Sequence, residues 1–455
     1  MAGGGFPVEN KPVTSIKIGG KLTFSIIISC IVVASSGILF GYDLGVSGGV
    51  TTMVPFLQKF FPDILRKAAG GSINGGAANI VMLILGRLLL GLGVGFTNQA
   101  APLYLSEIAP PKWRGTIGTS FQFFLGIGVV AANCINYVTA KHTWGWRLSL
   151  GLAVLPAAVM TIGAFLITDT PSSLVERGKI DQARKALSKV RGNSIDIETE
   201  LEELIKWTEI TKSVKQEPFK TILKRKYRPQ LVMAFAIPLF QQLSGINVVA
   251  FYSPNLFQSV GMGHEGALIS AIILGVVNLT SIFISASIVD RFGRRFLFIT
   301  GGILMFVCLI AVSIVLAVVS GVHGTNGVSK GNAILVLVLL CFYAAGFGWS
   351  WGPLTWLIPS EIFPVNIRTT GQSIAIGVQF ILTFVLSQTF LTMLCHFKFG
   401  AFVFYAFWVV VMTLFIIFFL PETKGISLES MYTIWGKHWF WSRFVKGEDD
   451  QENQS

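Results

Sequence analysis

The sequence Ser-Glu-Ile-Ala-Pro at residues 106–110 is repeated as Ser-Glu-Ile-Phe-Pro at residues 360–364, and an arginine, Arg114 or Arg368, follows each copy at the same spacing. Both copies therefore read Ser-Glu-Ile-x-Pro-x-x-x-Arg. Each copy directly follows a long apolar stretch. A repeated signature at the ends of apolar segments indicates two homologous halves embedded in a membrane.

The composition supports a membrane protein. Hydrophobic residues make up 52% of the chain and charged residues 13%, whereas a soluble domain carries about 25% charged residues. The net charge of +12 arises from basic residues concentrated in particular loops, which is typical of membrane topology rather than of nucleic-acid binding. These values exclude an ordinary soluble protein, and two membrane halves around a central site are typical of a transporter.

Apolar segments long enough to span a bilayer, roughly 20 residues each, occur ten times in the sequence. They lie near residues 22–46, 77–104, 116–138, 147–168, 230–257, 266–289, 296–320, 333–358, 370–394 and 400–420. We expect an all-α polytopic fold of two helical bundles. The predicted divisions are a tail (1–21), a bundle (22–168), a helical linker (169–228), a second bundle (229–420) and a second tail (421–455).

The two bundles differ in size, because the first has four predicted helices and the second has six. The motif Asp290-Arg-Phe-Gly-Arg-Arg295 follows the second helix of the second half, and the first half contains no copy of it. We infer that two helices are missing between about residues 67 and 77. Losing two helices preserves the alternation of loops across the membrane.

Lysine and arginine predict the orientation of the chain. The loops that hold Lys112 and Arg114, Arg291 to Arg295, and Arg368 fall on the same side as the linker and both tails. By the positive-inside rule this side is the cytoplasm. The loop at 47–76 is an exception, because it holds basic residues on the opposite side.

Two charged residues lie deep in apolar helices of the first half. Asp43 lies in Gly41-Tyr-Asp-Leu-Gly-Val-Ser-Gly-Gly49, and Arg87 lies among leucines. Charges at membrane depth are costly and usually functional, so we expect the two to pair. A pair that breaks when Asp43 is protonated would act as a proton switch, and the alternative is a static structural ion pair.

The second half contains three amide side chains within Gln241-Gln-Leu-Ser-Gly-Ile-Asn247. Amides both donate and accept hydrogen bonds, which suits the hydroxyl groups of a sugar. Polar or aromatic side chains at Gln122, Asn278, Gln379 and Trp356 extend this set. The alternative is that each amide makes only a hydrogen bond between helices.

A stretch rich in tryptophan and proline, Trp349 to Pro359, predicts a helix broken twice and a gate, with anchoring at the membrane interface as the alternative for Trp349 and Trp351. Charged residues at the predicted cytoplasmic helix ends suggest ion-pair latches that hold one conformation. The alternative is that these charges serve only membrane topology. The candidate latch residues are Glu107, Arg114, Glu361, Arg368, Asp290, Arg291, Arg294 and Arg295.

Catalytic and metal-binding patterns are not recognisable in the sequence. The glycine-rich stretch at residues 70–76 lacks the Lys-Ser/Thr of a phosphate-binding loop, and the five histidines and five cysteines do not have metal-ligand spacing. We therefore expect a protein that is not an enzyme and that uses no metal or cofactor.

Taken together, the motifs resemble those of the sugar porters of the major facilitator superfamily, and most closely the plant monosaccharide/proton symporters. The resemblance covers residues from about 20 to 435 and also rests on Pro102-Leu-Tyr-Leu-Ser-Glu-Ile-Ala-Pro110, Trp351-Gly-Pro-Leu-Thr-Trp-Leu-Ile-Pro359 and Pro421-Glu-Thr-Lys-Gly425. This family has twelve helices. The chain therefore resembles a member that lacks the second helix and most of the third.

The resemblance implies hexose import across the plasma membrane by alternating access, driven by the proton gradient. It implies that Asp43 accepts the proton with Arg87 as its partner, and that family members without proton coupling usually carry an uncharged residue at the Asp43 position. The implied partners are a hexose such as glucose or galactose, protons and the lipid bilayer, for a monomer that binds no nucleic acid. The alternatives are an uncoupled sugar facilitator and a non-transporting form such as a sugar sensor. The residues implied to line the sugar site are Gln122, Gln241, Gln242, Asn247, Asn278 and Trp356.

Overall fold

The computed structural model describes residues 23–50, 53, 80–109, 113–191, 197–213, 218–259, 263–320, 330–364, 367–397, 399–424 and 431–445. Within these ranges the chain forms helices and no strands. In this part of the chain, ten helical stretches are long and apolar enough to cross a membrane. The all-α fold and the ten spans predicted from the sequence are therefore confirmed.

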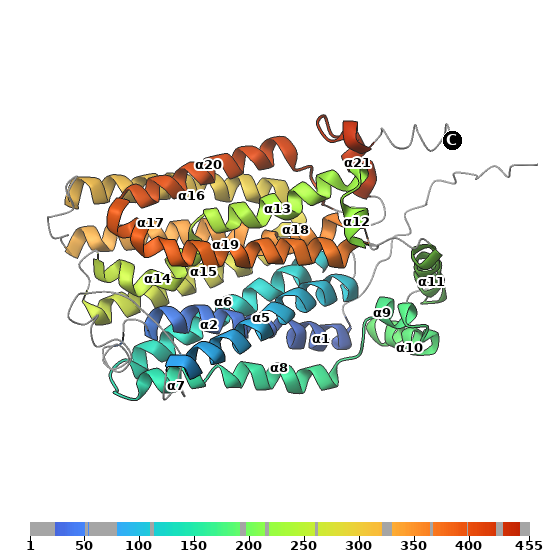
Figure 1. Ribbon diagram of the computed structural model, residues 1–455, viewed down its shortest axis with the longest axis horizontal. Helices are drawn as coiled ribbons and strands as arrows, with labels where there is room; N and C mark the ends of the chain where they lie inside the picture. The colour runs from blue at the N-terminus through green and yellow to red at the C-terminus, as the bar shows by residue number, and fades with distance from the viewer. Residues whose placement is uncertain are drawn as a thin grey trace, which may run out of the picture.

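The first half forms one bundle (Figure 1). Its helices are α1 (Phe24–Ala34), α2 (Ser36–Val50), α5 (Ile80–Ile108), α6 (Arg114–Thr139), α7 (Gly145–Gly151) and α8 (Val154–Leu166). Helix α2 packs very closely on α6, because a Cβ atom on Gly41 would lie only 1.9 Å from the backbone oxygen of Leu125. Only glycine permits this approach.

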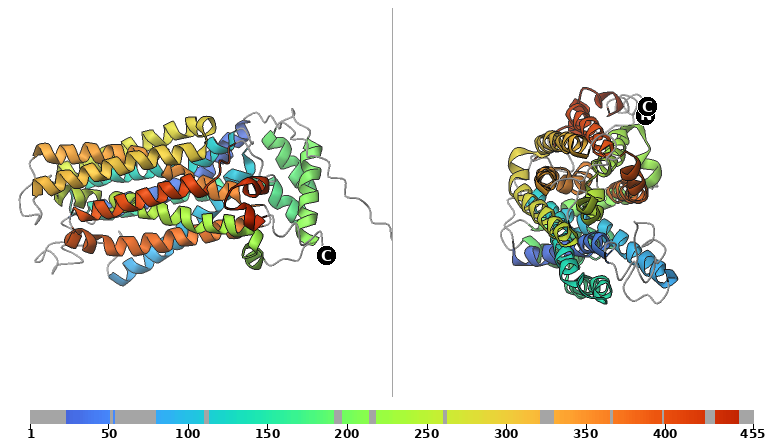
Figure 2. Two further views of the ribbon diagram at one scale, coloured as in Figure 1. Left: turned by 90° about the horizontal axis from the view of Figure 1, so that it is seen from above. Right: turned by 90° about the vertical axis from the view of Figure 1, so that its left-hand side faces the viewer.

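The linker forms helices α9 (Pro171–Glu176), α10 (Ile180–Arg191), α11 (Ile197–Ser213) and α12 (Pro218–Ile222). The Thr170 hydroxyl accepts a hydrogen bond from the Ser173 N–H and caps α9, which begins with a proline. Helices α9 to α12 lie at one end of the molecule (Figures 1 and 2), which we call the linker end.

The second half forms the larger bundle. Its helices are α13 (Arg228–Leu243), α14 (Ile246–Ser259), α15 (His264–Phe292), α16 (Arg294–Ser320), α17 (Lys330–Trp349), α18 (Trp351–Ile362), α19 (Arg368–Phe397) and α20 (Gly400–Phe419), followed by the short α21 (Met431–Lys437). The end-on view in Figure 2 separates the two bundles, with α6 of the first half packed on α15 and α18 of the second.

The predicted double break at the prolines between Trp349 and Pro359 is only partly correct. The helix is interrupted once, at Ser350, and Pro359 lies inside α18. Pro353 occupies the first turn of α18, where a missing N–H costs little because it has no partner within the helix. Trp351 is fully buried against Phe298, with ring centroids 4.5 Å apart, so it is a core residue rather than an interfacial anchor.

Candidate functional site

A break between α13 and α14 positions the predicted amide side chains. Gly245 has φ +87°, and a Cβ atom there would lie 2.9 Å from the Tyr405 ring. The backbone oxygen of Ser244 accepts a hydrogen bond from the Tyr343 hydroxyl at 2.7 Å. The glycine allows the left-handed conformation, and the tyrosines hold the break in place.

Four amide side chains form a continuous chain of hydrogen bonds at this break. Oε1 of Gln241 accepts from Nε2 of Gln379 at 2.5 Å and from Nε2 of Gln242 at 3.1 Å. Oε1 of Gln242 then accepts from Nδ2 of Asn247 at 3.0 Å. Residues from α13, α14 and α19 are thus held in one polar row inside an apolar bundle.

Other buried polar atoms have no hydrogen-bond partner among the described residues. An unpaired polar group in an apolar medium costs several kcal/mol, so these atoms favour a site that binds water or a hydroxyl-bearing ligand. They include Oε1 of Gln122, Oδ1 of Asn278, Oε1 of Gln372, Oε1 of Gln379 and Nε1 of Trp356.

Three of these residues line one hollow. It has a volume of about 330 Å³, which includes space open to solvent, and lies between α5, α13, α18 and α19. Trp356, Gln372 and Gln379 supply polar groups to its lining together with Thr355, and prolines supply much of the rest. Gln379 joins this hollow to the amide chain, since its Nε2 bonds Gln241 while its Oε1 stays unpaired among the described residues.

Trp356 connects this hollow to the first half. Its ring packs edge-on against Phe121 of α6, with centroids 5.2 Å apart, and it belongs to the apolar core of the first half. Gln122 is the next residue of α6 after Phe121. One turn later Gly126 packs against Leu279, which is the sequence neighbour of Asn278. Among the described residues no hydrogen bond links Gln122 or Asn278 to the amide chain.

Asp43 and Arg87 lie together, as their charges led us to expect. Arg87 on α5 donates from Nη1 to Oδ1 of Asp43 on α2, and from Nη2 to the Ser47 hydroxyl at 3.0 Å. Both charged side chains are mostly buried. The arrangement presents one carboxylate, held by one guanidinium, between two helices of the first half.

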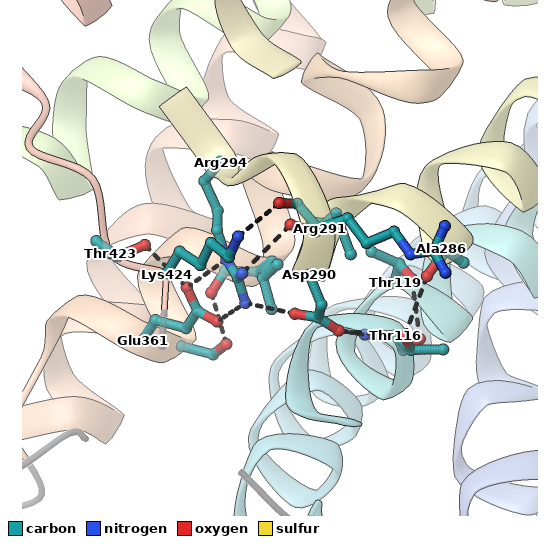
Figure 3. Close-up of polar contacts among 12 residues, drawn as sticks. Thr116, Thr119, Ala286, Asp290, Arg291, Arg294, Glu361, Thr423 and Lys424 are labelled. Atoms are coloured by element: carbon teal, nitrogen blue, oxygen red, sulfur yellow. Dashed lines mark hydrogen bonds and ion pairs between the residues drawn. The ribbon is translucent and has the colours of Figure 1, made fainter. Parts of the chain in front are cut away.

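Three of the predicted latch residues, Asp290, Arg294 and Glu361, form a network at the linker end (Figure 3). Arg294 makes a two-point ion pair with Glu361, with N–O distances of 2.8 and 3.2 Å, and a second contact of 3.1 Å with Asp290. Oδ2 of Asp290 accepts hydrogen bonds from the backbone N–H and the hydroxyl of Thr116 on α6, each at 3.2 Å. The network therefore joins the two halves.

Glu422 and Thr423, which were not among the predicted latch residues, complete this network. Glu422 accepts hydrogen bonds from the backbone N–H groups of Arg294 and Arg295, at 2.9 and 3.0 Å. The Thr423 hydroxyl donates to Glu361 at 3.1 Å. The motif Pro421-Glu-Thr-Lys-Gly425 was a signal that could have pointed to both residues.

The remaining latch candidates have different partners. Glu107 has a favourable electrostatic interaction with Arg368 in the other half. Arg368 also donates a hydrogen bond to the backbone oxygen of Phe363.

The arginines of the other motif bond to backbone or to lysine. Arg295 donates a hydrogen bond to the backbone oxygen of Ile417, and the backbone oxygen of Arg291 accepts one from Lys424. The side chain of Arg114 lies outside the described part of the structure.

Two further contacts join the halves. At the opposite end from the linker, Lys141 and Glu265 form an exposed ion pair with an N–O distance of 3.1 Å. Gln99 on α5 donates to the Ser373 hydroxyl on α19 at 2.5 Å. The halves are therefore in contact at both ends.

Two helical bundles joined by a linker, with unpaired polar atoms between them, define a membrane transporter with a central site. The chain belongs to the family described as "Sugar (and other) transporter", whose sequence profile matches residues 67–435. This is a family of transporters and not a class of enzymes.

The chain is similar to known proteins over almost its whole length. It is 53% identical to Sugar transport protein 5 of Arabidopsis thaliana, over 98% of this chain and 99% of the relative. It is 48% identical to the hexose carrier protein HEX6 of Ricinus communis, over 95% and 96% of the two chains. The fold is similar to that of the proton:xylose symporter XylE bound to 6-bromo-6-deoxy-D-glucose, with a TM-score of 0.74, 25% identity, and coverage of 90% of this chain and 99% of that one.

The alignment lengths support the inference that a segment is missing. The alignment with Sugar transport protein 5 spans 504 positions, which is 49 more than the 455 residues of this chain. At least that many positions of the relative have no counterpart here, enough for two spans of roughly 20 residues. The predicted place of the loss, between about residues 67 and 77, lies outside the described residues.

Proposed function

We propose that this protein is a hexose:proton symporter that works by alternating access, uses the proton gradient as its energy source and needs no cofactor. The observation that carries the proposal is a set of polar atoms at Gln379, Gln372 and Trp356 around one hollow, which have no partner among the described residues. Hydroxyl groups of a sugar would supply the missing donors and acceptors. The names of the hexose carrier and of the xylose symporter support the same substrate class.

Proton coupling is assigned to Asp43 and Arg87. The contact between Asp43 and Arg87 supports this assignment, because protonation of the carboxylate would remove the charge that holds the guanidinium. Loss of this bond would free α2 and α5 to move relative to each other. The network of Arg294, Glu361 and Asp290 would then act as a latch between the halves on the linker side.

We propose that the protein is a monomer in the plasma membrane, with both termini in the cytoplasm. The linker end carries Arg291, Arg294, Arg295 and Arg368, which supports a cytoplasmic placement by the positive-inside rule. Glucose and galactose are the proposed hexoses.

Transport in proteoliposomes tests the proposal. With acidic pH outside, the protein should accumulate labelled glucose or galactose. The Asp43→Asn variant should lose accumulation but keep exchange of sugar without a gradient. Asp169→Asn, which changes an exposed carboxylate outside the spans, is the matched control. Equal uptake by the wild type and Asp43→Asn, with no pH dependence, would instead show an uncoupled facilitator.

A second candidate function is a non-transporting product, such as a sugar sensor. A Cβ atom on Gly91, Gly93 or Gly95 of α5 would meet no atom within 4 Å, and Sugar transport protein 5 carries at least 49 positions that this chain lacks. In the described part of the chain, no other helix thus packs closely on α5 at these three glycines. Correct membrane insertion without uptake, together with uptake after the corresponding segment of Sugar transport protein 5 is inserted, would support this second function.

A further inference from the structure

Two segments distant in sequence place three arginines around one aromatic ring at the linker end. Relative to the centre of the Phe444 ring, the guanidinium carbon of Arg225 lies at 5.9 Å, that of Arg228 at 5.8 Å and that of Arg443 at 5.9 Å. Arg225 also donates to the backbone oxygen of Arg443 at 3.2 Å. These contacts join residues 225–228, at and just before the start of α13, to the segment after α21.

The positive charge at this cluster is not neutralised by the described protein. Within the described part of the chain, no carboxylate forms an ion pair with Arg225, Arg228 or Arg443. All three side chains are exposed. Like charges repel one another, so their convergence on one ring favours a bound anion. Membrane topology alone requires basic residues on this side but not their convergence.

The cluster lies at the level of the membrane surface. Arg225 and Arg228 stand at the start of the span that contains α13. The indole N–H of Trp439 donates to the backbone oxygen of Phe418, at the end of the α20 span, at 3.0 Å. Trp439 is 66% exposed, and exposed tryptophan at the end of a span is typical of the lipid headgroup region.

The sequence before α13 adds to the charge. Five basic residues occur in nine positions, which are Lys220, Lys224, Arg225, Lys226 and Arg228. Clusters of four to eight basic residues immediately beside a membrane span are typical of sites for anionic lipids. Arginine also binds phosphate with two parallel hydrogen bonds, which lysine cannot do.

We propose that Arg225, Arg228 and Arg443 form a binding site for the phosphate-bearing headgroup of an anionic phospholipid in the leaflet at the linker end. Phe440 and Phe444 hold the guanidinium groups in place by stacking, with Arg443 4.3 Å from the Phe440 ring centre. The bound lipid would join the linker to the segment after α21. This site is separate from the sugar hollow and does not depend on transport.

The test measures lipid binding by the full chain purified in mild detergent. Dioctanoyl phosphatidylinositol bisphosphate is titrated while thermal unfolding is followed, with dioctanoyl phosphatidylcholine as the neutral lipid. The wild type should be stabilised only by the anionic lipid, and the effect should weaken as salt rises. The variant R225Q/R228Q/R443Q should bind at least tenfold more weakly.

A matched control removes the same charge elsewhere at the linker end. The variant K179Q/K185Q/K189Q changes exposed lysines of the linker and should bind as the wild type does. If the arginine-to-glutamine triple does not fold, the three single variants should each weaken binding, and R225K/R228K/R443K should fold and bind more weakly than the wild type. Unchanged binding in the glutamine variants would overturn the proposal.

Two further results would also overturn it. Equal stabilisation by soluble inositol hexakisphosphate and by the lipid would show a free-phosphate site rather than a lipid site. Binding that emerges only after residues 446–455 are deleted would show that the acidic residues of that segment, which include Glu448, Asp449 and Asp450, occupy the cluster instead.

Discussion

Arg294 of α16 and Glu361 of α18 form a two-point ion pair inside the second bundle, and the same guanidinium contacts Asp290 of α15. Only 5% of the Arg294 side chain and 6% of the Glu361 side chain are exposed. Asp290 continues the connection to Thr116 in the first bundle. Arg294 of α16 therefore links α15 and α18 of the second half, and through Asp290 it is connected to the first half.

Removal of one partner of this pair should destabilise the protein strongly. Glu361→Gln leaves the Arg294 charge buried without its main partner, which costs about 3–5 kcal/mol. The double variant R294Q/E361Q should lose less stability than the sum of the two single variants, because neither charge then remains. Thermal unfolding in detergent measures all three, and additive losses would contradict the pairing.

A methyl group at Gly115 should separate the two halves at the linker end. A Cβ atom there would lie 2.2 Å from Oδ1 of Asp290, so Gly115→Ala should displace Asp290 from Thr116. Thr119, which is fully buried one turn along α6, should become accessible when it is changed to cysteine.

Labelling by a maleimide measures this accessibility, with the exposed Cys134 first changed to serine. Gly151→Ala is the control, because a Cβ atom on Gly151 meets no atom within 4 Å. Equal labelling of the Gly115→Ala variant and the control would show that the contact between Asp290 and α6 does not close this end.

The indole N–H of Trp356 should contribute to sugar affinity. Trp356→Phe keeps an aromatic ring against Phe121 but removes the unpaired Nε1. Loss of one hydrogen bond to a ligand is worth about 1 kcal/mol, so hexose should bind roughly fivefold more weakly. The control is Trp351→Phe, which removes another unpaired indole N–H away from the hollow. Equal losses of affinity in both variants would contradict the assigned site.

Acidification should loosen the segment after α21. Burial and the charge of Arg295 lower the pKa of His438 below its usual 6.5, and the neutral ring accepts a hydrogen bond at Nδ1 from the Phe440 N–H. The unfolded segment therefore binds more protons than the docked one. Docking should be stable above about pH 6.5 and weaken as the pH falls toward the lower pKa of the docked state.

Tryptophan fluorescence between pH 7.5 and 5.5 follows this change, because Trp439 and Trp441 lie in the segment and Trp435 of α21 packs against Trp441. In His438→Gln the side-chain oxygen can accept the same hydrogen bond without titrating, so the pH dependence should disappear. An identical pH profile in this variant would assign the change to another group.

Much of the fold could be predicted because it depends on local properties of the chain. The length of each apolar segment predicted ten spans, which the described residues contain. The contact of Asp43 with Arg87 could also be anticipated, because two isolated charges in apolar helices have few other partners.

The partners of Glu361 could not be predicted in the same way. The repeated motif draws attention to the arginine within each copy, whereas Glu361 pairs with Arg294 from another motif. Gln372 lines the hollow although nothing in the sequence distinguishes it from other polar residues of α19. Such contacts depend on how helices far apart in the chain are rotated and packed.

By itself the sequence determined that the chain lies in a membrane and that it has two related halves, and it predicted a first half that is two helices short. Hydrophobic length and repeated motifs carry that information, because each is a property of neighbouring residues. Only the tertiary structure decided which buried charges neutralise one another and which amides remain unpaired. These pairings join distant helices, and in an apolar interior a polar atom is satisfied only by what the packing places within about 3 Å of it.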